Sequence, residues 1–351
     1  MHFQGSKTWR PSHKKDLSGS AKHLIIALFV SLFLVSCLDK GSSQVHKSSR
    51  LLMGTFVEVS VVGNDQEAKK AASEVFDELK RIEMLTSFHG DSELAKINAN
   101  AGKGPVKTDP ELLKIIDEAL RVARETHGAF DPTVGPIAKL WGFSGEGESR
   151  LPSDSEIQET LPLVGWDKVK IDHEAGTVEL PQAGMALDLG AIGKGYALNG
   201  TAELLAKAGI RSALVNIGGD ILALGEKSPG KPWVIGVEDP RNSRAIVAVV
   251  SLKDKIIITS GDYERFFEKD GKRYHHILNP RTGYPADKLR SATVVGPVGS
   301  TLQPSGTAAF VLGVDQGRKY IESLKDAYGL LIDSEGNNHF TAGAESIFQL
   351  K

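Results

Sequence analysis

The sequence predicts an α+β protein built from mixed, largely antiparallel sheets with flanking helices. Short runs rich in β-branched residues are mixed irregularly with amphipathic helical segments, whereas a doubly wound parallel sheet would need a regular strand–helix order. The chain has 351 residues, enough for one large domain or two intimately joined ones. No repeat, low-complexity segment or linker divides residues 50–351, so we expect a single body there.

Two segments carry the helical pattern most clearly. Residues 66–85 place Val75, Leu79 and Ile82 on one stripe at three- and four-residue spacing, with charged residues on the opposite side. Residues 110–125 repeat this pattern. Further helices are expected over residues 196–207 and from near Ser305 and Gln316.

Strands are expected where β-branched and aromatic residues concentrate. The first is the run 56–61 (FVEVSV), in which apolar residues recur at every second position. The other expected strands are residues 186–189, 213–217, 234–237, 256–259, 291–295 and 330–333.

Bulk composition narrows the function little. The chain carries 42 basic and 44 acidic residues, a formal net charge of -2, which gives no reason to expect a nucleic-acid partner. Glycine is abundant, at 37 residues, and clusters in short runs where the backbone turns sharply or approaches another group closely. The candidate functional residues lie in and beside those runs.

The N-terminal segment has the pattern of a lipoprotein signal peptide over residues 1–36. Basic residues precede an apolar run of about twelve residues, 24–35 (LIIALFVSLFLV), which is too short to span a bilayer comfortably. The run ends in Leu-Val-Ser-Cys, which resembles a bacterial lipobox. Cys37 is the only cysteine, so it cannot form an internal disulfide, and we expect it to carry lipid. The alternative is a buried cysteine at the end of an apolar helix.

Residues 37–49 are polar and contain Gly and Ser, a composition typical of a flexible tether. We therefore expect an exported protein that is lipid-anchored to a bacterial membrane and faces the periplasm. Of the two membranes, we favour the inner one. The expected organisation is signal peptide, tether and a folded body over residues 50–351.

Four segments combine small residues with an acid, a base or a hydroxyl. Residues 127–136 (HGAFDPTVGP) form a turn, fixed by Pro and Gly, around Phe130 and Asp131. Residues 186–197 (ALDLGAIGKGYA) run from an expected strand towards a helix start, with Lys194 just before it, an arrangement able to bind an anion. The segment is not a Walker P-loop, because the required Gly-Lys-Ser/Thr order is absent.

The third segment joins residues 259–265 (TSGDYER) with residues 274–285 (YHHILNPRTGYP). Its adjacent histidines would face opposite sides of a strand, so we expect no transition-metal centre and take His275 as exposed. The fourth segment, residues 303–313 (QPSGTAAFVLG), is on its own typical of a helix start with a cap.

In order and spacing, these segments resemble the ApbE family of FAD:protein FMN transferases. The same holds for Met53-Gly54-Thr55, residues 88–94 (FHGDSEL), residues 216–220 (NIGGD) and residues 233–241 (WVIGVEDPR). The resemblance covers roughly residues 50–345 and implies an ApbE-like fold around a central FAD cleft.

The resemblance also implies roles for individual residues. The implied FAD contacts are Met53, Phe88, Ala129, Phe130, Asp131, Asp188, Lys194 and Ile277. Aromatic and thioether side chains in this set suit flat heterocycles. Where many relatives have tyrosine, Phe88 keeps the ring and lacks the hydroxyl.

The implied metal ion is Mg²⁺, a hard cation that takes oxygen ligands, held by the Ala191 carbonyl, Gln303 and Thr307. Relatives usually carry an aspartate where this chain has Gln303. An amide oxygen can still coordinate the ion, but the site loses one formal negative charge, which weakens metal affinity. A weaker working site, rescue by Asp262 or Asp287, and FAD binding without efficient turnover all remain open.

By resemblance, the expected reaction transfers FMN from FAD to a Thr or Ser hydroxyl of an acceptor protein, an exported redox subunit, and releases AMP. His276 is the implied general base, because imidazole titrates near neutrality. The alternative is a structural histidine that holds the Asn279–Gly283 turn. Two other functions stay open: Mg²⁺-dependent hydrolysis of FAD to FMN and AMP, and FAD binding alone.

Overall fold

The computed structural model describes residues 44–145, 148–300 and 302–351, which belong to one compact unit, Ser43–Lys351. The expected signal peptide over residues 1–36, Cys37 and the expected tether up to residue 43 lie outside the described residues. Within the described ranges, no helix combines the length and the hydropathy that crossing a membrane requires.

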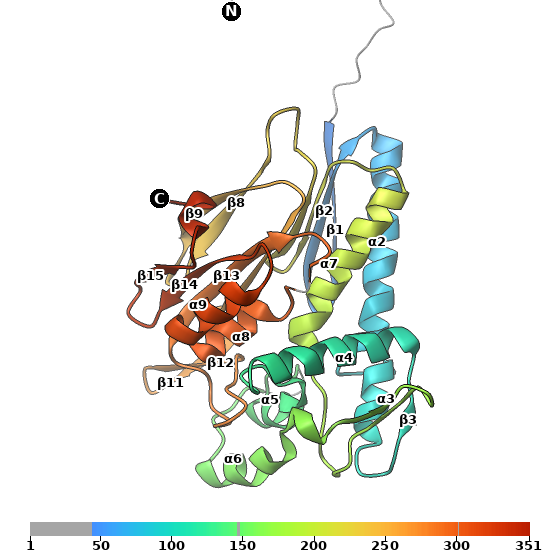
Figure 1. Cartoon of the computed structure of the whole chain (residues 1–351), viewed down its shortest axis with the longest axis vertical. Coiled ribbons are helices and arrows are strands. Elements are labelled where there is room, and N and C mark those ends of the chain that lie inside the picture. Colours follow the sequence, from blue (N-terminus) through green and yellow to red (C-terminus); the bar gives the residue numbers. More distant parts are fainter. Residues whose placement is uncertain (1–43, 146–147, 301) are drawn as a thin grey trace, which may run out of the picture. The chain divides into compact units, whose positions relative to one another are not determined.

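Helices and strands are interleaved irregularly along the chain, as expected (Figure 1). The helices are α2 (Asp65–Thr86), α3 (Glu93–Ala99), α4 (Pro110–Glu125), α5 (Gly135–Trp141), α6 (Asp154–Thr160), α7 (Gly190–Lys207), α8 (Ser305–Leu312) and α9 (Val314–Ser323). The strands are β1 (Gln44–Leu52), β2 (Thr55–Gly63), β3 (Val106–Lys107), β4 (Lys170–Asp172), β5 (Thr177–Glu179), β6 (Ala213–Ile217), β7 (Asp220–Leu224), β8 (Trp233–Asp239), β9 (Asn242–Leu252), β10 (Lys255–Gly261), β11 (Phe266–Lys269), β12 (Lys272–His275), β13 (Leu289–Pro297), β14 (Tyr328–Asp333), β15 (Asn338–Phe340) and β16 (Phe348–Leu350).

The main sheet has eight strands in the order β1-β2-β6-β7-β10-β13-β14-β15. Smaller sheets are formed by β16-β9-β8, β3-β5-β4 and β11-β12. The pairings between these strands are all antiparallel. The predicted α+β class with mixed, largely antiparallel sheets is therefore confirmed.

Strand β1 shortens the expected tether. It pairs with β2 from Gln44 opposite Gly63 to Leu52 opposite Thr55, so residues 44–49 belong to the folded body. The sequence hid this strand because β1 lies at the edge of the sheet, where polar side chains face solvent and apolar alternation is not required. The body begins at Gln44 rather than at residue 50.

The main sheet is buried on both faces. One face packs against helices α2, α7 and α8, where Val59 of β2, Leu79 of α2 and Phe310 of α8 share one apolar core. The other face packs against the β16-β9-β8 sheet through residues such as Ile257 and Trp233.

Helix α4 lies crosswise at the lower end of α7, which it contacts (Figure 1). It begins at Pro110 as predicted, because Asp109 Oδ1 accepts a hydrogen bond from Glu111 N at 2.8 Å. The carboxylate of Glu111 accepts hydrogen bonds from Arg81 of α2 and from the hydroxyl of Tyr196 of α7. The start of α4 is therefore fixed against both neighbouring helices.

Two expectations around residues 186–197 are wrong. Residues 186–189 form no strand; instead Leu187 N donates to Asn98 Oδ1 at 2.8 Å, and Asp188 N donates to the Pro132 carbonyl at 2.7 Å. Helix α7 begins at Gly190, so Lys194 lies inside the helix and not before it. The glycines at 190, 193 and 195 suggested a loop, because glycine disfavours a helix. In the structure they lie in α7, where Gly193 and Gly195 lie close to Thr86 and Gln303.

Candidate active site

A cavity of about 630 Å³ lies where the ends of α2, α7 and α8 meet the turns between the strands. Segments from nine parts of the chain line it, beginning with the β1–β2 turn and ending with the start of α8. Every residue for which the sequence implied a role in binding or catalysis lines this cavity: Met53, Phe88, Ala129, Phe130, Asp131, Asp188, Ala191, Lys194, His276, Ile277, Gln303 and Thr307. The individual roles remain predictions.

One wall is set by the tight β1–β2 turn. Met53 and Gly54 both adopt left-handed backbone angles, with φ of 53° and 68°, as a two-residue hairpin turn requires. The half-buried Met53 side chain packs on the apolar core next to the cavity. A thioether therefore forms part of the surface available to a flat ring.

Another part of the cavity wall contains Phe88 and the Ala129–Asp131 segment. Asp131 is buried, and burial raises the pKa of its carboxyl group. Its Oδ1 accepts hydrogen bonds from the amide and hydroxyl of Thr133, and its Oδ2 accepts one from Trp166 N. Asp131 thus fixes the shape of this wall in addition to facing the cavity.

The start of α7 supplies the polar floor. No side chain caps this helix through Leu189, although Asp188 Oδ1 accepts a hydrogen bond from Gly190 N at 2.8 Å. The amides of the first turn and the ammonium group of Lys194 both favour a negatively charged ligand. Ala191 lies in this first turn, where its carbonyl faces the amide of residue 195, so a cation would use the second lone pair of that oxygen.

Lys194 has a partner that the sequence did not identify. Its Nζ lies 3.8 Å from Asp220 Oδ2, and Asp220 Oδ1 accepts a 3.3 Å hydrogen bond from Thr259 N. Burial raises the pKa of Asp220, while the nearby lysine opposes that shift. Glu264, which also lines the cavity, has a pKa raised mainly by burial. Both acids lie in segments recognised from sequence, but spacing alone could not show that they meet Lys194.

The two neighbouring histidines lie in different environments. His276 lines the cavity, and its Nδ1 is 3.3 Å from the carbonyl oxygen of Arg265. Burial, reinforced by the positive charge of Arg265, lowers the pKa of His276 well below its usual value. A neutral imidazole can accept a proton, as a general base must.

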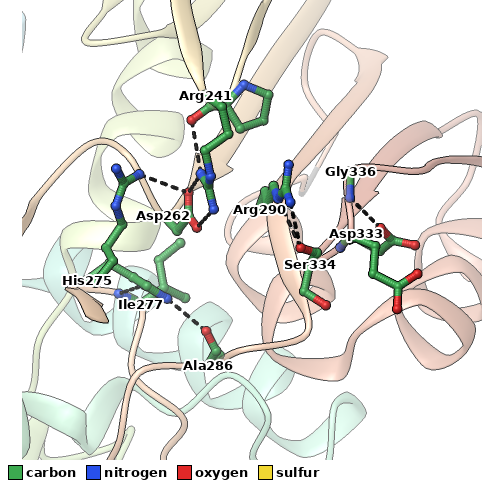
Figure 2. Close-up of polar contacts among 12 residues, drawn as sticks. Arg241, Asp262, His275, Ile277, Ala286, Arg290, Asp333, Ser334 and Gly336 are labelled. Atoms are coloured by element: carbon green, nitrogen blue, oxygen red, sulfur yellow. Dashed lines mark hydrogen bonds and ion pairs between the residues drawn. The ribbon is translucent and has the colours of Figure 1, made fainter. Parts of the chain in front are cut away.

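The expectation that His275 is exposed is wrong. Its side chain is 4% exposed, its Nε2 lies 2.8 Å from the Ala286 carbonyl, and its Nδ1 accepts a hydrogen bond from Ile277 N (Figure 2). Its ring also meets Phe310 edge-on. The alternation of a strand correctly separated the two histidines, but the side that faces away from the cavity is core and not solvent.

The corner that contains Gln303 and Thr307 fits a hard cation. Thr307 Oγ1 lies 3.2 Å from Ser260 Oγ, and the buried amide of Gln303 lies beside them on the same cavity wall. These are neutral oxygen donors of the type Mg²⁺ accepts. Gln303 Nε2 has no hydrogen-bond partner within the described part of the chain. These residues can therefore hold Mg²⁺ through oxygen atoms. The site carries one negative charge fewer than it would with an aspartate in place of Gln303.

Neither suggested rescue of that charge is available. Both carboxylate oxygens of Asp262 are held by Arg241, at 2.7 and 2.6 Å, as Figure 2 shows. Asp287 is exposed and does not line the cavity. Across the described ranges, no three His, Cys, Asp or Glu side chains gather as a metal-binding group.

The fold and the cavity together have the features of a nucleotide-binding enzyme. Helix-start amides and a lysine suit phosphates, apolar side chains suit flat rings, neutral oxygens suit a hard cation, and a neutral imidazole at His276 can accept a proton. A match to the model of the ApbE family spans residues 53–332. The chain therefore belongs to the ApbE family.

Two relatives match most of the chain. An FAD:protein FMN transferase of Treponema pallidum is 35% identical over 326 residues, which is 88% of this chain and 90% of the relative. One from Haemophilus influenzae is 33% identical and covers 96% of this chain and 98% of the relative.

Solved structures agree in fold. The ApbE protein of Thermotoga maritima superposes with a TM-score of 0.81 at 35% identity, covering 87% of this chain and 99% of that one. The flavin transferase ApbE of Vibrio cholerae has a TM-score of 0.78 at 28% identity, with the same coverage. The fold expected from the resemblance is thus confirmed.

Proposed function

We propose that this protein transfers FMN from FAD to a Thr or Ser hydroxyl of an acceptor protein. The observation that carries the proposal is the convergence of all the implied site residues, from distant parts of the chain, on one cavity. The curated relatives named above are FAD:protein FMN transferases, and the chain covers about nine-tenths of their length or more. A volume of about 630 Å³ also lies within the usual range for small-molecule sites.

In the proposed reaction, the acceptor oxygen attacks the phosphorus on the FMN side of the diphosphate. A bond forms between that oxygen and phosphorus, the bond to the bridging oxygen breaks, and AMP leaves with the bridging oxygen. His276 takes the hydroxyl proton, because its lowered pKa keeps the imidazole neutral at physiological pH. Lys194 and the first turn of α7 face the negative charge of the diphosphate.

The proposed metal is Mg²⁺, which would neutralise charge on the diphosphate when bound. Gln303, Thr307 and the Ala191 carbonyl are the residues that would hold it. Ser260 orients Thr307 through the hydrogen bond between their hydroxyls. The apolar wall at Met53, Phe88 and Phe130 holds the rings and excludes water from their faces.

The proposed partner and location follow from the sequence. We propose an acceptor on an exported redox subunit, and an anchor in a bacterial membrane, the inner membrane, through lipid on Cys37, with the body facing the periplasm. Six residues separate Cys37 from Gln44, where β1 begins, and they would form the tether. Labelling cells with a fatty-acid probe should mark the wild-type protein and leave Cys37→Ser unmarked; equal labelling would contradict the anchor.

The test of the transfer reaction uses the full chain with FAD, Mg²⁺ and an acceptor domain. Mass spectrometry should show the acceptor gain one FMN joined as a phosphoester, and an acceptor with Ala at the modified residue should gain nothing. Failure to modify any acceptor, together with AMP release at the same rate with and without it, would replace the proposal with FAD hydrolysis. Bound FAD that stays intact would leave FAD binding alone.

A further inference from the structure

We propose that Mg²⁺ and FAD bind this protein as a coupled pair, because the substrate diphosphate supplies the negative charge that Gln303 does not. The apoprotein then has little affinity for Mg²⁺ by itself. This inference rests on the proposed function, since it concerns the same cavity and the same dinucleotide.

The placement of Gln303 is tightly constrained. The residue is 4% exposed and packs over Gly195 of α7, where an added Cβ would lie 1.5 Å from Gln303 Cγ and 2.3 Å from Nε2. The amide nitrogen is among the atoms nearest to Gly195, and it has no hydrogen-bond partner among the described residues. The amide oxygen Oε1 is the atom that could coordinate a cation, and it brings a dipole but no net charge.

Three of the other acids on the cavity wall are already engaged by neighbouring groups. Asp131 is held by Thr133 and Trp166, and Asp220 lies against the ammonium group of Lys194. Asp188 already accepts the amide of Gly190. No three potential metal-binding acids, histidines or cysteines come together in the part of the chain that the structure describes.

The diphosphate supplies what this corner lacks. Each of its two phosphates carries a negative charge, and Mg²⁺ is commonly bound through one or two carboxylates together with substrate phosphates. With no carboxylate at Gln303, a larger share of the metal affinity has to come from those phosphates. By linkage, the factor by which FAD tightens Mg²⁺ binding equals the factor by which Mg²⁺ tightens FAD binding.

The test compares the wild-type full chain with Gln303→Glu, which has nearly the same shape and adds the charge. Gln303→Asp provides a second, shorter acid, and Gln349→Glu adds the same charge at an exposed position on β16, away from the cavity. Calorimetry measures Mg²⁺ binding without FAD, flavin fluorescence measures FAD binding with and without Mg²⁺, and circular dichroism verifies folding of each variant.

Wild type and Gln349→Glu should show at least about tenfold tighter FAD binding with Mg²⁺ and only weak binding of Mg²⁺ alone. Without FAD, Gln303→Glu or Gln303→Asp should bind Mg²⁺ at least about tenfold more tightly than wild type does. The factor by which Mg²⁺ tightens FAD binding should be smaller in that variant than in wild type. If wild type binds Mg²⁺ alone as tightly as a correctly folded acidic variant, or if Mg²⁺ leaves FAD affinity unchanged, the inference is overturned.

The acceptor assay separates this inference from the proposed function. Transfer of FMN together with tight binding of Mg²⁺ to the wild-type apoprotein would overturn the coupling and leave the function in place. Strong coupling without modification of any acceptor would do the reverse.

Discussion

His275 and His276 are neighbours in the sequence but serve opposite sides of the chain: His275 Nε2 lies 2.8 Å from the Ala286 carbonyl in the core, whereas His276 lines the cavity. His275 also accepts the amide of Ile277 through Nδ1. Since Ile277 lines the cavity too, the buried histidine fixes the backbone that carries both cavity residues. The segment therefore has one imidazole on the cavity wall and one buried in the core.

The first prediction separates these two histidines. Replacing His276 with Gln should lower the rate of FMN transfer by about 10²- to 10⁴-fold, the usual contribution of a general base. FAD affinity, measured by flavin fluorescence, should change far less.

Replacing His275 with Gln should instead lower the free energy of unfolding by about 1–3 kcal/mol, because buried hydrogen-bonding groups lose their partners. Urea denaturation measures this change. If His275→Gln is as stable as wild type and His276→Gln is fully active, both the structural role of His275 and the catalytic role of His276 are contradicted.

The second prediction concerns pH. Burial and Arg265 lower the pKa of His276 in the folded protein, whereas the unfolded chain should titrate near the ordinary value of 6.5. In the folded protein, the imidazole of His276 therefore remains neutral at pH 6.5 and gains a proton only at a lower pH. The acid limb of kcat/KM should accordingly have its midpoint below pH 6.5.

The same shift affects stability. As the pH falls below 6.5 the unfolded chain binds a proton that the folded chain does not, so the free energy of unfolding falls with pH until the folded pKa is reached. His276→Gln should remove this component from denaturation curves recorded between neutral and acid pH. A midpoint for activity at or above 6.5 in the wild-type enzyme would contradict the assignment of the base.

The third prediction uses two glycines of α7. An added Cβ at Gly195 would lie 1.5 Å from Gln303 Cγ, so Gly195→Ala should displace that side chain and weaken Mg²⁺-dependent FAD binding by about tenfold or more. Titration with FAD at a fixed Mg²⁺ concentration measures the effect.

Gly200→Ala is the matched control. Its Cβ would meet only the end of the flexible Glu78 side chain, at 3.4 Å, so the helix should gain about 0.5–1 kcal/mol with no loss of FAD affinity. Equal FAD affinities in the two alanine variants would show that Gln303 does not need its present position.

The fourth prediction concerns the suggested rescue of the metal site. Asp262→Asn should leave the affinities for Mg²⁺ and FAD unchanged, because the Asp262 carboxylate is bound by the guanidinium group of Arg241 and not by a metal ion. It should lower the free energy of unfolding by only about 1–2 kcal/mol, because Arg241 is partly exposed and solvent screens the pair. Asp287→Asn, at an exposed position, should change neither quantity. Loss of Mg²⁺ binding in Asp262→Asn would restore that residue as a metal ligand.

Local patterns predicted elements whose own residues define them. Helix α4 occupies residues 110–125 as expected, because Asp109 caps it, Pro110 suits its first position and its apolar stripe is regular. Strand β6 also has the expected bounds, 213–217. Strand β1 and the early start of α7 were missed, because an edge strand and a glycine-containing helix are stabilised by neighbours from distant parts of the chain.

The sequence by itself determined the α+β class, the family and the residues that line one cavity, because composition, periodicity and motif order are local or sequential properties. Only the tertiary structure decided that His275 is buried, that Asp262 belongs to Arg241, and that Asp220 faces Lys194. The physical reason is that burial and charge pairing depend on which side chains folding brings within a few ångströms. Positions in the chain do not specify those distances.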